Sequence, residues 1–153
     1  MTMSHRLIAT IPAPGCTATE GQLRTNKKLV EEFYNTTGAA KAALIHKDYV
    51  QHDPAFLKRA RAKNISDYDE IVEFIMRSAA EGSSEADDRE LEILIAECDI
   101  VAAVIKRTRT DPDPTVPPGR TYNLFRFDVF RIKEGKLFEH WDGVDIANKP
   151  DGA

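Results

Sequence analysis

The chain has 153 residues, enough for one domain with a buried core, and it carries a net charge of -4 with a sequence pI near 5.6. An acidic chain of this kind is not expected to bind nucleic acid, because phosphate binding is driven by clustered Lys and Arg side chains. No apolar run approaches the roughly 18 residues of a membrane span, and the first residues lack the apolar core of a secretory signal. Composition therefore predicts a cytoplasmic protein without a membrane segment.

Further classes of protein are excluded by individual residue types. Cys16 and Cys98 are too few for a disulfide scaffold, and no residues show the spacing of a zinc ligand set. The two cysteines are predicted to be free thiols in a reducing compartment. The only basic run, residues 58–63, is interpreted as a solvated loop or helix face rather than a phosphate site. There is no glycine-rich phosphate loop, and no cofactor is expected.

The first part of the chain contains an arm and two predicted helices. Residues 1–20, with prolines and a glycine, are expected to be a flexible arm. Apolar residues then recur at helical spacing over residues 22–38. Residues 39–46 offer a short second helix, with His46 near its C-terminal end, where a helix dipole favours a cation.

A short extended piece and a third helix follow. Residues 49–54 are predicted to be extended, because Pro54 disfavours the helical conformation in the residue before it. This places His52 on an extended segment. Ser66 begins a signal close to a capping box, and the apolar stripe that follows predicts a helix over residues 66–82.

The second half of the chain changes to strand patterns. Four β runs are predicted, over residues 91–97, 100–109, 122–132 and 136–144. The loop between the second and third runs contains four prolines, which exclude a strand there. Three helices followed by an antiparallel meander predict a single α+β domain over residues 21–147, with the helices packed on one sheet face. Residues 148–153 are expected to be a disordered tail.

The last two β runs form a predicted hairpin that places ionisable side chains among aromatic ones. A three-residue loop from Lys133 to Gly135, with the glycine in the left-handed conformation, sets which side chains face each other. The predicted facing pairs are Phe130 with Phe138, Asp128 with His140, and Arg126 with Asp142, all on one face. An even-numbered loop would place Asp128 and Asp142 on opposite faces, so the prediction depends on this turn.

Both faces of this hairpin are apolar enough to be covered. The first face carries Arg126, Asp128, His140 and Asp142 among Tyr122, Leu124, Phe130, Ile132, Phe138 and Val144. The opposite face carries Phe125, Phe127, Val129, Leu137 and Trp141, with Arg131 and Glu139 as a predicted ion pair. Because an unpaired buried charge is costly, the ionisable groups of the first face must either pair or line a wet pocket. Two interpretations stay open: satisfied cross-strand pairs, or an acid–base site.

Histidine and carboxylate residues also raise the question of a metal. His52 is a candidate for the same pocket, because its extended segment points toward the sheet. His52, His140, Asp128 and Asp142 together could hold a divalent ion. No short-spaced pair such as His-x-His or His-Glu-x-x-His supports this, so no metal is predicted.

Two motifs combine with the helix-first α+β order. They are Tyr49-Val50-Gln51-His52-Asp53-Pro54 and the run from Phe127-Asp128-Val129-Phe130-Arg131 through Gly135-Lys136 to Glu139-His140-Trp141-Asp142. Together they resemble the SnoaL-like polyketide cyclase family of the nuclear transport factor 2-like superfamily, and the resemblance covers residues 23–145. It implies a cone-shaped fold in which a strongly curved antiparallel sheet encloses a pocket closed by three N-terminal helices. It also implies a homodimer through the outer sheet face, for which the candidate residues are Phe125, Phe127, Val129 and Trp141.

The resemblance implies residue roles as well. Asp142 falls where the characterised cyclases carry the pocket aspartate that acts as general acid/base. Asp128 falls where those cyclases carry a histidine, and Asp53 replaces the asparagine that is usual in the extended segment. The superfamily also contains dehydratases, isomerases, epoxide hydrolases and non-catalytic binding proteins, so the fold alone does not name the reaction.

The leading hypothesis is a cofactor-free pocket enzyme that moves protons on a small hydrophobic carbonyl-containing substrate, as an aldol-type cyclase, isomerase or lyase does. The expected catalytic residues are Asp142, Asp128, His140 and His52. The expected substrate-binding residues are Arg126, Tyr49, Tyr122, Leu124, Phe130 and Phe138. One alternative is a non-catalytic small-molecule-binding protein of the same fold. Another is a dimeric interaction module whose pocket is closed by a salt bridge between Arg126 and Asp142.

Overall fold

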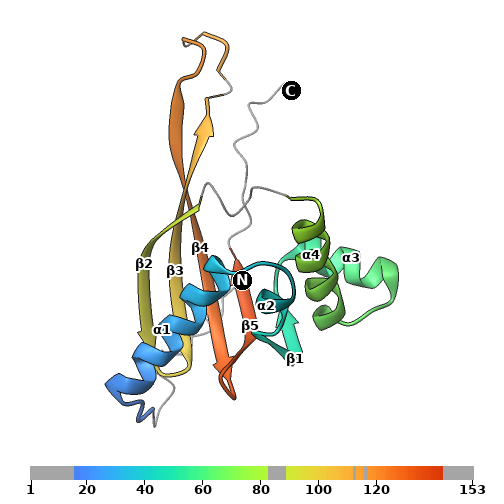
Figure 1. Ribbon diagram of the computed structural model, residues 1–153, viewed down its shortest axis with the longest axis vertical. Helices are drawn as coiled ribbons and strands as arrows, with labels where there is room; N and C mark the ends of the chain where they lie inside the picture. Colours follow the sequence, from blue (N-terminus) through green and yellow to red (C-terminus); the bar gives the residue numbers. More distant parts are fainter. Residues whose placement is uncertain (1–15, 83–88, 112, 116, 143–153) are drawn as a thin grey trace, which may run out of the picture.

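The computed structural model describes residues 16–82, 89–111, 113–115 and 117–142 and combines one sheet with helices, which confirms the predicted α+β class (Figure 1). Within the described residues the elements are α1 (Glu20–Asn35), α2 (Gly38–Ala42), β1 (Ile45–Gln51), α3 (Pro54–Lys63), α4 (Asp67–Ala80), β2 (Arg89–Glu97), β3 (Ile100–Thr110), β4 (Thr121–Lys133) and β5 (Lys136–Asp142). None of the described helices is both long and apolar enough to cross a membrane.

The strands form one sheet in the order β1-β5-β4-β3-β2. β2 to β5 are an antiparallel meander, as predicted, whereas β1 runs parallel to β5 at the edge of the sheet. Figure 1 shows α1 lying across the meander, with α2, α3 and α4 grouped near β1. The inner sheet face and the helices share one core, whose buried side chains include Val30, Phe33, Ile75, Ile105, Phe130 and Leu137.

Polar side chains start the two helices that follow β1. Ser66 accepts a hydrogen bond from the backbone N–H of Asp69 at 3.0 Å, which confirms the predicted start of α4. Asp53 accepts one from the backbone N–H of Ala55 at 2.6 Å, and Pro54 occupies the first turn of α3, where a missing N–H is tolerated. These caps decide where β1 ends and the helical layer begins.

One predicted helix is too long. The helix expected over residues 39–46 ends at Ala42, and Ile45–Gln51 forms β1 instead. His46 is therefore a buried strand residue, 3% exposed, and not the last residue of a helix. The physical reason is tertiary: this segment pairs with β5, and alternate side chains of a strand can then enter the core.

α3 has no counterpart among the predicted elements, and it carries the basic run 58–63. Arg59 Nε and Lys63 Nζ lie 2.8 and 2.6 Å from the two carboxylate oxygens of Glu70, an α4 side chain that is 1% exposed. Burial alone would raise the pKa of Glu70, but Lys63 and Arg59 outweigh it and lower the pKa. The basic residues therefore neutralise a buried carboxylate and join α3 to α4.

The prediction of free thiols is wrong, because Cys16 and Cys98 form a disulfide. The bond joins the segment before α1 to the turn between β2 and β3, across a sequence separation of 82 residues. The spacing of two cysteines does not reveal that the fold brings them together. The prediction of a reducing compartment depended on free thiols and therefore loses its support. The cytoplasmic location stays a prediction. Of the predicted arm and tail, residues 1–15 and 148–153 lie outside the described residues.

The turn between β4 and β5 has two residues, not the predicted three. Glu134 and Gly135 both have left-handed φ angles, 53° and 71°, and Lys133 pairs directly with Lys136. Two consecutive left-handed residues are typical of a type I′ turn, whose twist matches that of the flanking strands. On its own, such an even-numbered turn would reverse the faces of the β5 side chains relative to the prediction.

A bulge at Phe138 restores the predicted faces. Phe138 is an extra residue, because Leu137 and Glu139 pair with consecutive residues of β4. Beyond it the facing pairs are Val129 with Trp141, Phe130 with His140, and Asp128 with Asp142. Each predicted facing pair is therefore shifted by two residues, so that Asp128 faces Asp142 and not His140. Because a shift of two keeps each side chain on its face, Arg126, Asp128, His140 and Asp142 still share the inner face. Leu137, predicted on the outer face, precedes the bulge and is fully buried in the core.

Candidate functional site

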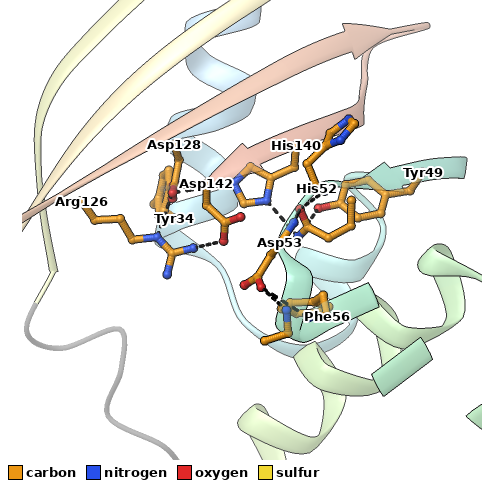
Figure 2. Close-up of polar contacts among 11 residues, drawn as sticks. Tyr34, Tyr49, His52, Asp53, Phe56, Arg126, Asp128, His140 and Asp142 are labelled. Carbon is orange, nitrogen blue, oxygen red and sulfur yellow. Dashed lines mark hydrogen bonds and ion pairs between the residues drawn. The ribbon is translucent and has the colours of Figure 1, made fainter. Parts of the chain in front are cut away.

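The inner face of the hairpin opens into a pocket of about 170 Å³. One wall consists of side chains from the sheet, and the other includes side chains from α1, α2, α3 and α4. The polar lining residues include Tyr34, Gln51, Asp53, Arg126, Asp128, His140 and Asp142, and the apolar ones include Phe33, Phe56, Ile71, Phe74 and Ile75. A concave site in which convergent polar groups lie beside apolar side chains is typical of small-molecule binding. Figure 2 shows the polar side chains converging between the sheet and the start of α3.

Asp128 is the anchored carboxylate of this pocket. Its Oδ2 accepts a hydrogen bond from the Tyr34 hydroxyl, and its Oδ1 lies 2.8 Å from Arg126 Nε. His140 Nε2 lies farther away, at 3.8 Å from Oδ1. Burial alone would raise the pKa of Asp128, but His140, Arg126 and Tyr34 together lower it to about 2. Asp128 is therefore ionised at neutral pH and poorly suited to exchange protons.

Asp142 is held less completely. Its Oδ2 accepts a hydrogen bond from Arg126 Nη2, whereas its Oδ1 is buried and has no hydrogen-bond partner among the described residues. Burial raises the pKa of Asp142 above its ordinary value, although His140 and Arg126 oppose the shift. The predicted contact between Arg126 and Asp142 is confirmed, but it uses one carboxylate oxygen only. One arginine thus holds two carboxylates whose pKa values move in opposite directions, as in sites that separate a proton carrier from an electrostatic anchor.

His140 is held by two neighbours, Phe130 and Gln51. Its ring stacks on Phe130 with centroids 4.3 Å apart, and its Nδ1 lies 3.2 Å from Nε2 of Gln51. Its Nε2 is buried and has no hydrogen-bond partner among the described residues. The predicted pairing of Asp128 with His140 is present only as the 3.8 Å contact, which is too long for a hydrogen bond.

His52 does not reach the pocket, and that expectation is wrong. Its Nε2 lies 2.8 Å from Oε1 of Glu139, and its ring stacks on Trp141 with centroids 5.0 Å apart. Adjacent residues of an extended segment point to opposite faces, and Gln51 takes the inward position. His52 therefore belongs to the outer face of the sheet.

Of the predicted substrate-binding residues, one lines the pocket and the others lie outside its lining. Arg126 lines the pocket, whereas the lining does not include Tyr49, Tyr122, Leu124, Phe130 or Phe138. Phe130 lies behind His140, and the Tyr49 hydroxyl accepts a hydrogen bond from Gln51 at 3.3 Å, so both support the wall. Phe138 is the bulge residue and packs edge-on against His46. Tyr122 is 43% exposed on β4.

Tyr34 and Gln51 are site residues that the sequence analysis missed. Tyr34 belongs to the apolar stripe of α1, and only its hydroxyl, bonded to Asp128, distinguishes it from a core residue. Gln51 is 3% exposed at the end of β1. A buried amide needs hydrogen-bond partners, so a glutamine among inward-facing strand positions is the signal that could have found it.

Asp128, His140 and Asp142 also have side chains of the kinds that bind metal ions. Donor atoms of Asp128, His140 and Asp142 lie within 4.8 Å of one another, which is close enough for a shared ion. The Arg126 guanidinium already contacts both carboxylates and supplies the positive charge that a metal would bring. The donor set therefore fits an arginine-bridged carboxylate pair better than a metal centre.

Compared by sequence, the chain matches no protein-family model and no curated protein. Its structure is similar to IdmH from Streptomyces antibioticus, assigned as a polyketide cyclase, with a TM-score of 0.53 and 19% identity over 77% of this chain and 90% of that one. A protein from Jannaschia sp. CCS1, assigned as a SnoaL-like polyketide cyclase, gives a TM-score of 0.52 with 13% identity over 82% and 89% of the two chains. TsrD from Streptomyces laurentii gives 0.50 with 20% identity over 78% and 87%.

The chain has the fold of the SnoaL-like polyketide cyclases. The expected nuclear transport factor 2-like architecture is therefore confirmed, with α3 added to the three predicted helices among the described residues. At these identities the likeness concerns the fold alone, so the chemistry of the pocket has to be argued from its own residues.

Proposed function

We propose that the pocket is a cofactor-free acid–base site that removes and returns a proton next to a carbonyl group, in the manner of an aldol-type cyclase, isomerase or lyase. The observation that supports this most is the state of Asp142. One of its oxygens is held by Arg126, and the other is buried beside the pocket without a partner among the described residues. A carboxyl group whose pKa burial raises is better matched to proton transfer near neutral pH than an ordinary aspartate.

The other polar residues have separate tasks in this proposal. Asp142 accepts the proton from the carbon next to the carbonyl, and the electron pair of that C–H bond moves toward the carbonyl oxygen to form an enolate. The unpartnered Nε2 of His140 lies on the same wall, where it stabilises that oxygen. Asp128 stays ionised and orients Arg126, which in turn positions Asp142. His52 has no part in this reaction, because it lies on the other face.

The substrate is small or enters only in part. The pocket volume of about 170 Å³ lies below the roughly 300–1,000 Å³ that is usual for drug-sized ligands. Phe33, Phe56 and Phe74 supply apolar surface from the helical side, opposite the carboxylates. We therefore propose a hydrophobic substrate whose carbonyl end reaches the sheet.

Replacement of Asp142 by asparagine tests the proposal, because it keeps the size of the side chain and removes the proton acceptor. We expect Asp142→Asn to lower turnover of β-keto and polyketide-like compounds by about 10²- to 10⁴-fold. Glu139→Gln is the matched control: Glu139 lies on the same strand but pairs with Arg131 and His52 on the outer face. Equal turnover by wild type and Asp142→Asn across such a panel would reject Asp142 as the catalytic group.

A non-catalytic binding protein is the second candidate, and one observation favours it. Arg126 contacts both Asp128 and Asp142, so each carboxylate already has a cationic partner at rest. This candidate predicts saturable binding of an apolar carbonyl compound without conversion, and equal affinity in Asp142→Asn. Calorimetry with the same panel of compounds separates it from the enzyme.

The outer sheet face supports a further part of the proposal, a homodimer. The exposed fractions of Phe125 and Phe127 are 49% and 62%, and those of Ile93 and Ile95 on β2 are 50% and 64%. Val104 of β3 lies between Ile93 and Phe127 in one cross-strand row, so these side chains form a continuous apolar surface. Large exposed apolar patches mark interaction sites, and a two-fold dimer pairs such a patch with itself.

A further inference from the structure

Gln51 uses every hydrogen-bonding position of its side-chain amide. Its Oε1 accepts hydrogen bonds from the backbone N–H groups of His52, at 2.8 Å, and Asp53, at 3.2 Å. The first of these N–H groups is shared with the carbonyl oxygen of His140. Its Nε2 contacts the hydroxyl of Tyr49 at 3.3 Å and Nδ1 of His140 at 3.2 Å. The side chain is 3% exposed, so no bulk water competes for these bonds.

The orientation of this amide follows from its backbone partners. If oxygen and nitrogen were exchanged, the NH₂ group would face two N–H donors, and the N–H of Asp53 would lose the acceptor that the amide oxygen provides. The observed orientation is therefore the one that satisfies the network, and it directs an N–H of Gln51 at His140 Nδ1. A nitrogen that accepts a hydrogen bond carries no proton, so the proton of a neutral imidazole must lie on Nε2.

We propose that Gln51 is a positioning residue that donates a hydrogen bond to Nδ1 of His140 and thereby keeps the imidazole proton on Nε2, directed at the pocket. The contacts of Gln51 and the stacking of the ring on Phe130 fix both the tautomer and the direction of that N–H. Oδ1 of Asp128 lies 3.8 Å from Nε2, beyond hydrogen-bond distance, and Nε2 has no hydrogen-bond partner among the described residues. Nε2 is therefore a buried donor held ready for a group that enters the pocket.

This assignment deepens the proposed function, on which its catalytic meaning rests. A ring nitrogen of His140 and a carboxylate oxygen of Asp142 lie within 4.8 Å of each other, so one small carbonyl compound can contact both side chains. The proton leaves carbon for Oδ1 of Asp142, the electron pair moves into the enolate, and the enolate oxygen accepts a hydrogen bond from Nε2–H. His140 keeps its proton throughout, and Asp142 returns its own to the product. The site accordingly selects substrates that present an oxygen acceptor to His140.

Long-range ¹H–¹⁵N correlation spectra of the imidazole rings test the assignment without any substrate. The chain has four histidines, and His140→Gln identifies the His140 signals by their loss. We expect wild type to show a protonated Nε2 and a bare Nδ1 at His140 near neutral pH. Gln51→Glu replaces the donor opposite Nδ1 by a carboxylate oxygen, and we expect a proton on Nδ1 in that variant. Tyr49→Phe is the matched control, because it removes the other contact of the Gln51 amide nitrogen and should leave the tautomer unchanged.

Each result of these spectra tests one part of the proposal for Gln51. A proton on Nδ1 in wild type would overturn the assignment, and so would a folded Gln51→Glu variant with the wild-type tautomer. If Gln51→Glu does not fold, the wild-type spectrum alone still decides where the proton lies. The spectra do not depend on turnover, so an inactive panel together with the expected tautomer would count against the enzyme proposal and leave the role of Gln51 intact.

Discussion

The two faces of the β4–β5 hairpin carry the same kinds of side chain in different surroundings. On the inner face, Arg126 contacts Asp128 and Asp142, whose side chains are 5% and 4% exposed, and His140 lies beside them. With little water to screen them, these charges act strongly on one another, and the pKa values of the two carboxyl groups move in opposite directions.

The outer face also brings an arginine, a carboxylate and a histidine together, but there the side chains are in contact with water. Arg131 lies 2.8 Å from Glu139, which also contacts His52, and the side chains of Arg131 and His52 are 42% and 41% exposed. Exposed ion pairs of this kind are screened and contribute little to stability. An arginine, a carboxylate and a histidine thus form a candidate proton-transfer site on one face and a surface cluster on the other, so burial distinguishes the site more than residue type does.

Replacing the arginine of each face, Arg126 or Arg131, tests this comparison most directly. We expect Arg126→Met to lower the free energy of unfolding by about 2–3 kcal/mol, because it leaves two buried carboxylates without their cation. This value is below the ~3–5 kcal/mol of a fully enclosed pair because the arginine itself is 35% exposed. Arg131→Met should cost less than about 1 kcal/mol. Urea unfolding of both variants measures the difference, and equal losses would contradict the role given to burial.

Acid titration sharpens the contrast between the two inner carboxylates. The pKa of Asp128 is lowered from 3.8 to about 2, so its ionised form contributes to stability above pH 3.8, and this contribution is lost as pH falls toward 2. The lost contribution is about 2 kcal/mol. The pKa of Asp142 is raised above 3.8, so the folded state binds its proton more tightly, and the resulting stabilisation is lost as pH rises above 3.8 through the raised pKa.

Single asparagine variants separate these two opposing effects. In Asp128→Asn the loss of stability between pH 4 and 2 should become smaller. In Asp142→Asn that loss should remain, and the fall in stability as pH rises above 4 should become smaller. Unfolding free energies measured on both sides of pH 4 provide the test. The same slope in both variants would show that the two carboxylates do not differ as the structure indicates.

A charge on the outer apolar surface tests whether that face is covered in solution. We expect Phe127→Glu to weaken dimer formation by at least about tenfold, because a carboxylate would be buried against the partner copy. Sedimentation over a range of protein concentrations measures the dissociation constant, and Lys136→Glu, an exposed position beside the β4–β5 turn, is the control. A monomer in wild type would contradict the dimer itself.

Much of the fold could be predicted because its signals are local. The alternating pattern of the four meander strands and the capping signal at Ser66 act within a few residues, and all of them appear in the structure. β1 was visible only as a short extended segment, because its pairing with β5 is a contact between distant parts of the chain. The disulfide between Cys16 and Cys98 was missed for the same reason.

The candidate site was predicted in part, through two errors that cancel. The hairpin turn is shorter by one residue than expected, and the bulge at Phe138 adds one residue to β5, so the inward set of side chains is unchanged. Tyr34 and Gln51, which fix Asp128 and His140, could not be assigned because their partners come from other elements. His52 was placed on the wrong face because the pleat of β1 is set by that same distant pairing.

The turn itself offers the smallest expected effect. Glu134 has a φ of 53°, a conformation that asparagine adopts more readily than glutamate, and Asn-Gly is a preferred pair for a type I′ turn. We expect Glu134→Asn to raise the free energy of unfolding by about 0.5 kcal/mol. Gly135→Ala should lower it, since Gly135 has a φ of 71°. Neither turn residue lines the pocket, so neither variant should alter the pH dependence set by Asp128 and Asp142. Thermal unfolding at two pH values checks this.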